Sequence, residues 1–228
     1  MTAVPHIVIA IDGPAASGKS STSQWVAEKL GFLHVDSGSL YRALTAALLR
    51  AGAPPERWTP AVMLAQGSRI SLRAAATSCS ALIDGTAAEE EIRGTLVTAH
   101  VSRVATVPDV RAWVNARVRE AARDHDVVVD GRDMGTAVFP EATLKIFLIA
   151  DPWERARRRL GQRLDHRPTE EEIAAETDVL VQRDAKDATQ TVQAKDAVVL
   201  DTTYLTQAEQ VERIVALARA VSQRPHVT

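Results

Sequence analysis

Short apolar runs alternate with longer amphipathic stretches along most of the chain. Five of these runs are short and rich in branched side chains, as buried strands are: residues 6–12, 32–36, 126–130, 144–150 and 197–202. A helical pattern follows each of the first two runs. Gly31 ends the first of these expected helices, and Gly52 ends the second. Buried strands that are separated by helices favour a parallel sheet covered on both faces. The pattern therefore predicts an α/β fold with a five-stranded parallel sheet flanked by helices.

One region departs from this alternation. Residues 68–84 show period-two patterns around a centre of small residues, which is typical of a hairpin. Together with the helix expected before it, residues 60–92 would form a small α+β insertion on a single domain spanning 1–228. Two helices, 93–105 and 108–124, should follow. The last residues, 223–228, are expected to fray.

Three later helices carry start signals in the sequence. Asp151 precedes a proline and a glutamate, as an N-cap residue often does. Thr169 and Thr206 each stand three residues before a glutamate, the spacing of a capping box. We interpret these as folding signals with no catalytic role.

Composition narrows the class of protein. The 228 residues carry a formal net charge of −2, so no global basic field indicates nucleic-acid binding. A single cysteine, Cys79, excludes an intramolecular disulfide and fits a reducing compartment. The sequence contains no run of 18 apolar residues, so it predicts no membrane-spanning helix. The N-terminus lacks the charged region of a signal peptide. We expect a cytoplasmic protein without membrane or nucleic-acid partners. The six histidines show no metal-ligand spacing, so we expect no zinc site.

The first predicted strand leads into "GPAASGKS", which matches the phosphate-binding P-loop pattern completely. Glycines let successive backbone N–H groups turn inward around an anion, and the following helix adds its positive N-terminal end. Lys19 would supply charge to the β- and γ-phosphates of a nucleotide, and Ser20 a hydroxyl to Mg²⁺. The expected nucleotide-binding residues are Gly13, Pro14, Ala15, Ala16, Ser17, Gly18, Lys19, Ser20 and Ser21. The Asn-Lys-x-Asp guanine signature is absent, since Asn115 is the only asparagine, which argues against a GTPase.

Two further segments suggest a second phosphate. In "VDSGSLYR", Asp36 ends a strand at the sheet edge where ligands bind, Ser37 can cap the next helix, and Arg42 lies one turn further. In "VVVDGRDMGT", Asp130 ends a buried strand, where an acid commonly orients magnesium waters. Arg132 can fork onto a phosphate, and the carboxylate of Asp133 can accept a hydrogen bond from an amino group on a base. The proposed metal ligands are Ser20, Asp36 and Asp130.

An arginine-rich helix, "WERARRRLGQR" at 153–163, offers cations for phosphoryl transfer. One interpretation is a solvated basic helix, and the other is a short helical lid, at about 157–170, that closes over the transferring group. We expect two or three of its five arginines to point inward. Arg155 is assigned to ATP, and Arg158 and Arg159 join Lys19 and Arg132 as catalytic residues.

Taken together, the motifs resemble the bacterial cytidylate kinases, a branch of the nucleoside monophosphate kinases. The matching segments, in the family's order, are "IDGPAASGKSS", "DSGSLYR", "EIR", "VSRVATVPDVR", "DGRDMGTAVFP" and "LKIFLIA". The resemblance implies a P-loop kinase core in which the 60–92 insertion binds the nucleoside monophosphate (NMP). It also implies transfer of a phosphoryl group from ATP, with Mg²⁺, to CMP or dCMP, in a monomer.

The resemblance also assigns substrate contacts. Ser37, Arg42 and Arg132 would hold the CMP phosphate. Ser102, Arg111 and Asp133 would read the cytosine, and Arg183 and Asp187 would meet the ribose. One position departs from the family pattern, because Gln190 stands where another arginine is common. A glutamine cannot fork onto a phosphate with charge, so we expect no phosphate contact from it.

Two other functions stay open at this point. One is a P-loop kinase for another small acceptor, such as UMP, shikimate or dephospho-coenzyme A. The other is a nucleotide-sensing protein without catalysis, which the arginine-rich helix disfavours. ADP formation that depends on an added acceptor separates an enzyme from a sensor.

Overall fold

A computed structural model describes residues 6–222, and the two ends of the chain, residues 1–5 and 223–228, lie outside the description. The fraying predicted for 223–228 falls there. The chain separates into two compact units. Among the described residues, one unit, called here the hairpin unit, comprises His6 with Gly31–Val127. The other, the P-loop unit, comprises Ile7–Leu30 with residues 128–222.

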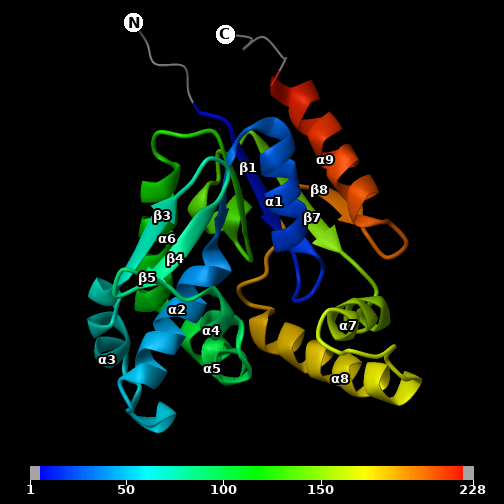
Figure 1. Cartoon of the computed structure of the whole chain (residues 1–228). Coiled ribbons are helices and arrows are strands. Elements are labelled where there is room, and N and C mark those ends of the chain that lie inside the picture. Colours follow the sequence, from blue (N-terminus) through cyan, green and yellow to red (C-terminus); the bar gives the residue numbers. More distant parts are fainter. Residues whose placement is uncertain (1–5, 223–228) are drawn as a thin grey trace, which may run out of the picture. The chain divides into compact units, whose positions relative to one another are not determined.

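The larger sheet has five strands, in the order β2-β6-β1-β7-β8, which confirms the predicted strand count. The strands are β1 (Val8–Asp12), β2 (Leu33–Asp36), β6 (Val127–Gly131), β7 (Leu144–Ile149) and β8 (Val198–Asp201). β7 pairs in parallel with both β1 and β8 (Figure 1). Ile9 and Ile11 point to one face of β1 and Ala10 points to the other, and all three are completely buried, so this part of the sheet is covered on both faces as the continuous apolar runs predicted.

Helices of the P-loop unit begin where the sequence signals placed them. They are α1 (Lys19–Leu30), α7 (Pro152–Gly161), α8 (Glu170–Asp187) and α9 (Gln207–Ser222). The carboxylate of Asp151 accepts from two backbone N–H groups at the start of α7, and Thr169 forms a complete capping box with Glu172. Thr206 and Glu209 bond reciprocally before α9. α1 and α9 pack together, and Thr22 donates a hydrogen bond to Gln210 across them (Figure 1).

The hairpin unit contains the predicted antiparallel strands, β3 (Ile70–Ala74) and β4 (Cys79–Ile83), and a short third strand, β5 (Thr86–Ala87). Its helical segments are α2 (Ser37–Arg50), η1 (Pro55–Arg57), α3 (Pro60–Ala65), η2 (Gly67–Arg69), α4 (Glu89–Arg93), α5 (Thr95–Ala105) and α6 (Pro108–Ala122). The core is built from one face of α2, represented by Leu40, Leu44 and Leu48, with Ile83 from β4, all at most 1% exposed.

The start of α2 differs from the prediction in one detail. Asp36 is the N-cap residue, and its carboxylate accepts from the N–H of Gly38 at 2.8 Å. Ser37 is already the first residue of the helix, so the prediction that it caps α2 was wrong. The reason is local, because Asp36 has the extended backbone of an N-cap and a carboxylate that reaches two residues ahead.

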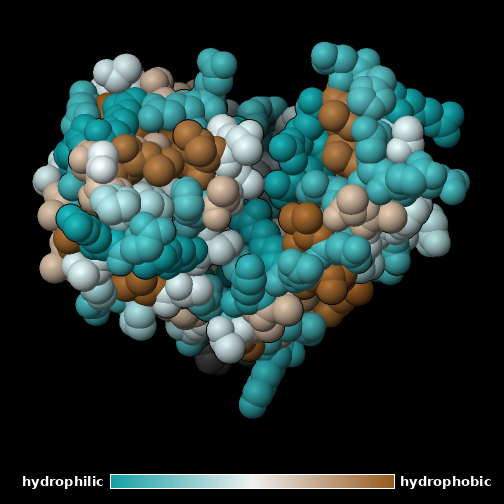
Figure 2. Space-filling model, turned by 90° about the horizontal axis from the view of Figure 1, so that it is seen from below, coloured by the Kyte–Doolittle hydropathy of each residue, from teal (hydrophilic) through white to brown (hydrophobic). Residues whose placement is uncertain are grey.

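The described surface is mixed in character. Figure 2 shows one face on which hydrophobic side chains form separate groups among hydrophilic ones. Within residues 6–222, no helix is both long enough and apolar enough to span a bilayer.

Candidate active site

The loop between β1 and α1 has the backbone conformation that the P-loop pattern requires. Gly13 has φ +148° and Gly18 has φ +88°, and residues with a side chain rarely adopt these backbone angles. A Cβ at Gly13 would lie 2.2 Å from the carbonyl oxygen of Leu148, so the neighbouring strand leaves no room for one. Ala16 adopts φ +57°, the left-handed region that a non-glycine residue enters only at a cost. The predicted strand, loop and helix are therefore confirmed in this order.

Three cationic side chains converge on this loop from three different elements. Each donates to one of three consecutive loop carbonyls: Arg132, after β6, to Gly13 at 3.0 Å; Lys19, from α1, to Pro14; and Arg155, from α7, to Ala15 at 2.8 Å. Such a concentration of positive charge beside a turn of backbone N–H groups suits a polyphosphate.

Lys19 is 7% exposed, and its ammonium also lies 3.4 Å from the hydroxyl of Ser17. Burial and, secondarily, the nearby charge of Arg132 lower the pKa of Lys19 to about 7, while Asp130 and Asp12 oppose the shift. Near neutral pH this lysine is therefore poised to become fully charged when a negative ligand arrives.

Ser20 and Asp130 form the pair of oxygen donors that the sequence suggested for a magnesium ion. The Ser20 hydroxyl donates to the Asp130 carboxylate at 2.7 Å, and Asp130 is 2% exposed. Two adjacent hard oxygen atoms, one of them charged, fit the ligand preference of Mg²⁺, which keeps several of its own waters. Asp36, the third candidate ligand, caps α2 and lies 3.7 Å from the guanidinium of Arg93.

Asp12, which the sequence analysis did not single out, organises the loop after β6. It is 4% exposed and accepts hydrogen bonds from the backbone N–H groups of Met134 and Gly135, both at 2.8 Å. These residues open a π-helical turn, Met134–Val138, directly after Asp133. Burial raises the pKa of Asp12 to about 6, although the two hydrogen bonds lower it. An acid at the end of the apolar run "VIAID" was the available signal.

Arg132 lies against the acid proposed for the ribose. It donates to the carboxylate of Asp187, the last residue of α8, at 3.2 Å, and Arg183 lies 3.8 Å from the same carboxylate. The neighbouring Asp133 is 8% exposed. The structure thus brings together three substrate-binding candidates of the P-loop unit, namely Arg132, Arg183 and Asp187. Gln190 follows α8, and its backbone N–H donates to the carbonyl of Asp187.

The arginines of α7 have different partners. Arg155 is 4% exposed and is held by Asp184 of α8 as well as by the nucleotide loop. Arg158 donates to the backbone carbonyls of Thr202 and Thr203. The other partners are acidic: Arg159 pairs with Glu176, and Arg157 pairs with Glu154 on its own helix. Arg155 is the α7 arginine that contacts the nucleotide loop directly.

The remaining substrate candidates belong to the hairpin unit. Arg42 of α2 donates to the carbonyl of Ile92 at 3.3 Å and to the hydroxyl of Thr98 at 3.1 Å. Arg111 of α6 donates to the carbonyl of Ala105, and its guanidinium lies 5.9 Å from the ring centre of Tyr41. Ser37 is 2% exposed and Ser102 is partly exposed on α5.

The chain is similar along most of its length to proteins of one family. The sequence profile of the family described as cytidylate kinase matches residues 9–220. A cytidylate kinase of Thermus thermophilus is 42% identical over 212 residues, which cover 93% of this chain and 98% of the relative. One of Oceanobacillus iheyensis is 38% identical over 216 residues, covering 92% and 93%.

The fold has its own parallel among solved structures. Shikimate kinase from Bacteroides thetaiotaomicron superimposes with a TM-score of 0.51 at 15% sequence identity, covering 96% of this chain and 99% of that one. At such low identity the likeness concerns the fold alone, and it confirms the predicted P-loop kinase architecture. The match of the family profile to most of the chain, and of relatives above 30% identity along nearly their whole length, places this chain in the cytidylate kinase family.

Proposed function

We propose that this protein transfers the γ-phosphoryl group of ATP to the phosphate of CMP and dCMP, yielding CDP or dCDP and ADP. The observation that carries the proposal is the P-loop unit, in which Lys19 and Arg132 converge on the nucleotide loop beside the Ser20–Asp130 pair. A kinase needs such cations, because phosphoryl transfer depends mainly on positioning and on neutralising charge. Membership of the cytidylate kinase family supports CMP as the acceptor.

On the donor side, the loop N–H groups and the Lys19 ammonium bind the β- and γ-phosphates of ATP. Lys19 leaves the carbonyl of Pro14 to do so, because an ionised phosphate oxygen is the stronger acceptor. Ser20 and Asp130 would hold Mg²⁺, with Asp36 as a further candidate. When bound, the ion would neutralise negative charge on the phosphates of ATP.

On the acceptor side, each part of CMP meets a group of matching chemistry. Ser37, Arg42 and Arg132 hold the phosphate. The carboxylate of Asp133 accepts from the exocyclic amino group of cytosine, and Ser102 and Arg111 complete the recognition of the base. Arg183 and Asp187 meet the ribose hydroxyls. UMP would present a carbonyl oxygen to Asp133 in place of an amino group, which is repulsive.

No side chain has to act as a general base in this reaction. A phosphate oxygen of CMP is already ionised and nucleophilic near neutral pH, so the residues only have to align it with the γ-phosphorus. Arg158 and Arg159 of α7 stabilise the charge on the transferring group once the lid, at about 157–170, has closed. Closure excludes water and so suppresses hydrolysis of ATP. Such a protein would act on small molecules as a cytoplasmic monomer.

The proposal is tested by measuring initial rates of ADP formation with CMP, dCMP, UMP and AMP, each with and without Mg²⁺. We expect rapid ADP formation with CMP and dCMP, at least tenfold slower formation with UMP, and almost none without an acceptor. A preference for UMP would point to the other kinase activity. ADP formation that is equal with and without any acceptor would contradict the proposal.

A further inference from the structure

Ala15 of the nucleotide loop is held at both of its backbone polar groups by a single ion pair. Its N–H donates to Oδ1 of Asp184 at 3.2 Å, and its carbonyl accepts from Nη1 of Arg155 at 2.8 Å. The same Nη1 lies 2.7 Å from Oδ2 of Asp184. Arg155 and Asp184 thus close a ring of charge-assisted contacts on one loop residue. Neither partner is adjacent to the loop in sequence, since Arg155 lies on α7 and Asp184 on α8.

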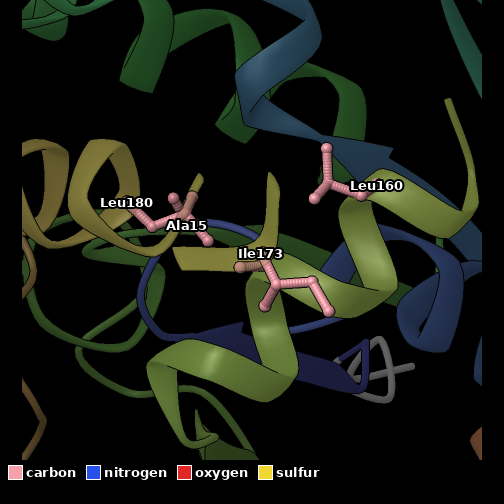
Figure 3. Packing of buried hydrophobic residues seen from close by; sticks show 5 residues of the cluster. Ala15, Leu160, Ile173 and Leu180 are labelled. Atoms are coloured by element: carbon pink, nitrogen blue, oxygen red, sulfur yellow. The ribbon is translucent and has the colours of Figure 1, made fainter. Parts of the chain in front are cut away.

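Apolar packing fixes the same three elements against one another. Ala15 and Ala156, with Leu160 of α7 and Ile173 and Leu180 of α8, form a buried cluster, and Leu180 is completely buried. Figure 3 shows Leu160, Ile173 and Leu180 on their helices with Ala15 near Leu180. The ion pair therefore sits on a rigid support, because buried side chains in a packed cluster have little freedom.

The neighbouring residue explains why the loop needs this hold. Ala16 adopts φ +57°, a left-handed conformation that a residue with a Cβ enters only at a cost in free energy. Strained conformations of this kind persist where the surroundings over-determine them. Fixing both peptide groups of Ala15 sets the chain direction into Ala16 and onward to the inward-turned N–H groups.

Arg155 differs from Arg132 in its burial and in how closely an acid neutralises its charge. Arg155 is 4% exposed, and it also donates through Nε to the carbonyl of Ala150 at 3.1 Å. Its charge is balanced by Asp184 at short distance. Arg132 is more exposed, at 20% of its side chain, and lies further from its acid, at 3.2 Å. Arg155 is consequently bound into the scaffold.

We propose that Asp184, acting through Arg155 and Ala15, is a positioning residue that holds the nucleotide loop in the conformation that receives the phosphates of ATP. The proposal rests on ATP being the donor of the reaction proposed above. Asp184 touches no reacting atom, so its loss acts on ATP affinity and leaves the affinity for CMP unchanged.

The test compares Asp184→Ala and Asp184→Asn with the wild type. The asparagine keeps an oxygen for the Ala15 N–H but removes the charge facing Arg155. Because asparagine has nearly the same shape as aspartate, this variant should fold even if the alanine variant does not. Asp178→Asn is the matched control, because Asp178 is an exposed acid on the same helix. The measurements are the dissociation constant of ATP by calorimetry, the KM values for ATP and CMP, and the melting temperature.

We expect ATP binding to weaken about tenfold or more in Asp184→Ala and by a smaller factor in Asp184→Asn, since a lost hydrogen bond to a charged group has this effect. The KM for CMP should stay within about twofold, and the control should match the wild type. ATP binding within twofold of the wild type in both variants would overturn the inference. So would an equal rise in the constants for ATP and CMP with a lower melting temperature, which indicates general destabilisation.

The binding measurement keeps this inference separate from the proposed function. ATP binding by calorimetry needs no turnover of CMP. A wild type that does not phosphorylate CMP, but whose ATP affinity depends on Asp184, would remove the proposed acceptor and leave the positioning role standing.

Discussion

Lys19 has to carry positive charge at a position where burial opposes it. In the structure it is 7% exposed, and its pKa falls to about 7 because of burial and, secondarily, the charge of Arg132. The protonated form is the one that attracts phosphate, so bound ATP must raise this pKa again. ATP binding and protonation of Lys19 are therefore linked, and each favours the other.

The linkage gives a pH dependence with a definite sign. Below pH 7 the lysine of the free protein is already charged, and ATP affinity should change little through this group. Above pH 7 ATP binding must take up a proton, so the affinity should fall by as much as roughly tenfold per pH unit. Calorimetry between about pH 7 and pH 8.5, in two buffers of different ionisation enthalpy, measures the proton uptake. Proton uptake that persists unchanged in Lys19→Gln would show that another group is responsible.

Arg132 makes a different prediction, because the proposal assigns it to the acceptor phosphate. Removing its guanidinium in Arg132→Ala should lower kcat/KM for CMP at least 10²-fold, the effect of losing a charge-assisted phosphate contact in the transition state. ATP binding should survive, since Lys19 and the loop N–H groups remain. Steady-state kinetics with CMP as the varied substrate measures the loss.

Arg117→Ala is the matched control for Arg132. Arg117 lies on α6, its side chain is 45% exposed, and it pairs with Glu120 on the same helix. It should leave the kinetics unchanged. Equal kcat/KM in Arg132→Ala and the wild type would refute the role of Arg132.

The residues that sequence reasoning missed share one property. Asp12 and Asp184 act on backbone groups that are far away along the chain: Asp12 on Met134 and Gly135, and Asp184 on Ala15, 169 residues earlier. Motifs that lie within a few residues, such as the loop itself, could be found because their spacing alone defines the chemistry. The partner of a lone carboxylate depends on the tertiary fold, which no local spacing reveals.

Among the elements, α8 joins folding to function. It begins at a capping box formed by Thr169 and Glu172, packs on α7 through Ile173 and Leu180, and ends at Asp187 beside Arg132. One helix thus supports the nucleotide loop along its length and presents the acid proposed for the ribose at its end. Its packing should therefore affect ATP binding as well as stability.

Leu180→Ala tests this coupling. Removing a completely buried side chain should lower the free energy of unfolding by about 2–5 kcal/mol. Because the cavity would lie beside Ala15, the KM for ATP should rise more than the KM for CMP. Val181→Ala changes the neighbouring residue, which is 48% exposed, and should alter the stability by less than about 0.5 kcal/mol. Urea denaturation and steady-state kinetics measure both effects, and a stability loss without a change in the KM for ATP would show that the cluster is structural only.

The elements that could be predicted are those whose signals are local. The caps at Asp151, Thr169 and Thr206 and the hairpin at 68–84 follow from patterns within a few residues. The π-helical turn Met134–Val138 could not be predicted, because its first two N–H groups donate to Asp12, which belongs to a different strand, β1. The wrong prediction for Ser37 shows the limit of such signals. Asp36 and Ser37 are both residues that often cap helices, and the sequence alone does not tell which of the two caps α2.

At the scale of the whole molecule, the alternation of strands and helices predicted the five-stranded parallel sheet, because buried parallel strands need apolar side chains on both faces. The P-loop unit contains all the residues assigned to ATP, from Gly13 to Ser21 with Arg155. The residues assigned to CMP come from both units of the chain. Their roles followed from the family resemblance, since no spacing in a single sequence indicates which base an aspartate recognises.

The most direct test of the central claim is to follow the phosphorus atoms of an equimolar mixture of ATP, CMP and Mg²⁺ by ³¹P NMR after the protein is added. We expect the resonances of CDP and ADP to grow at equal rates, with almost no inorganic phosphate, and no reaction with Lys19→Ala. Growth of inorganic phosphate and ADP without CDP would contradict the account, because it would mean that water, and not CMP, accepts the phosphoryl group.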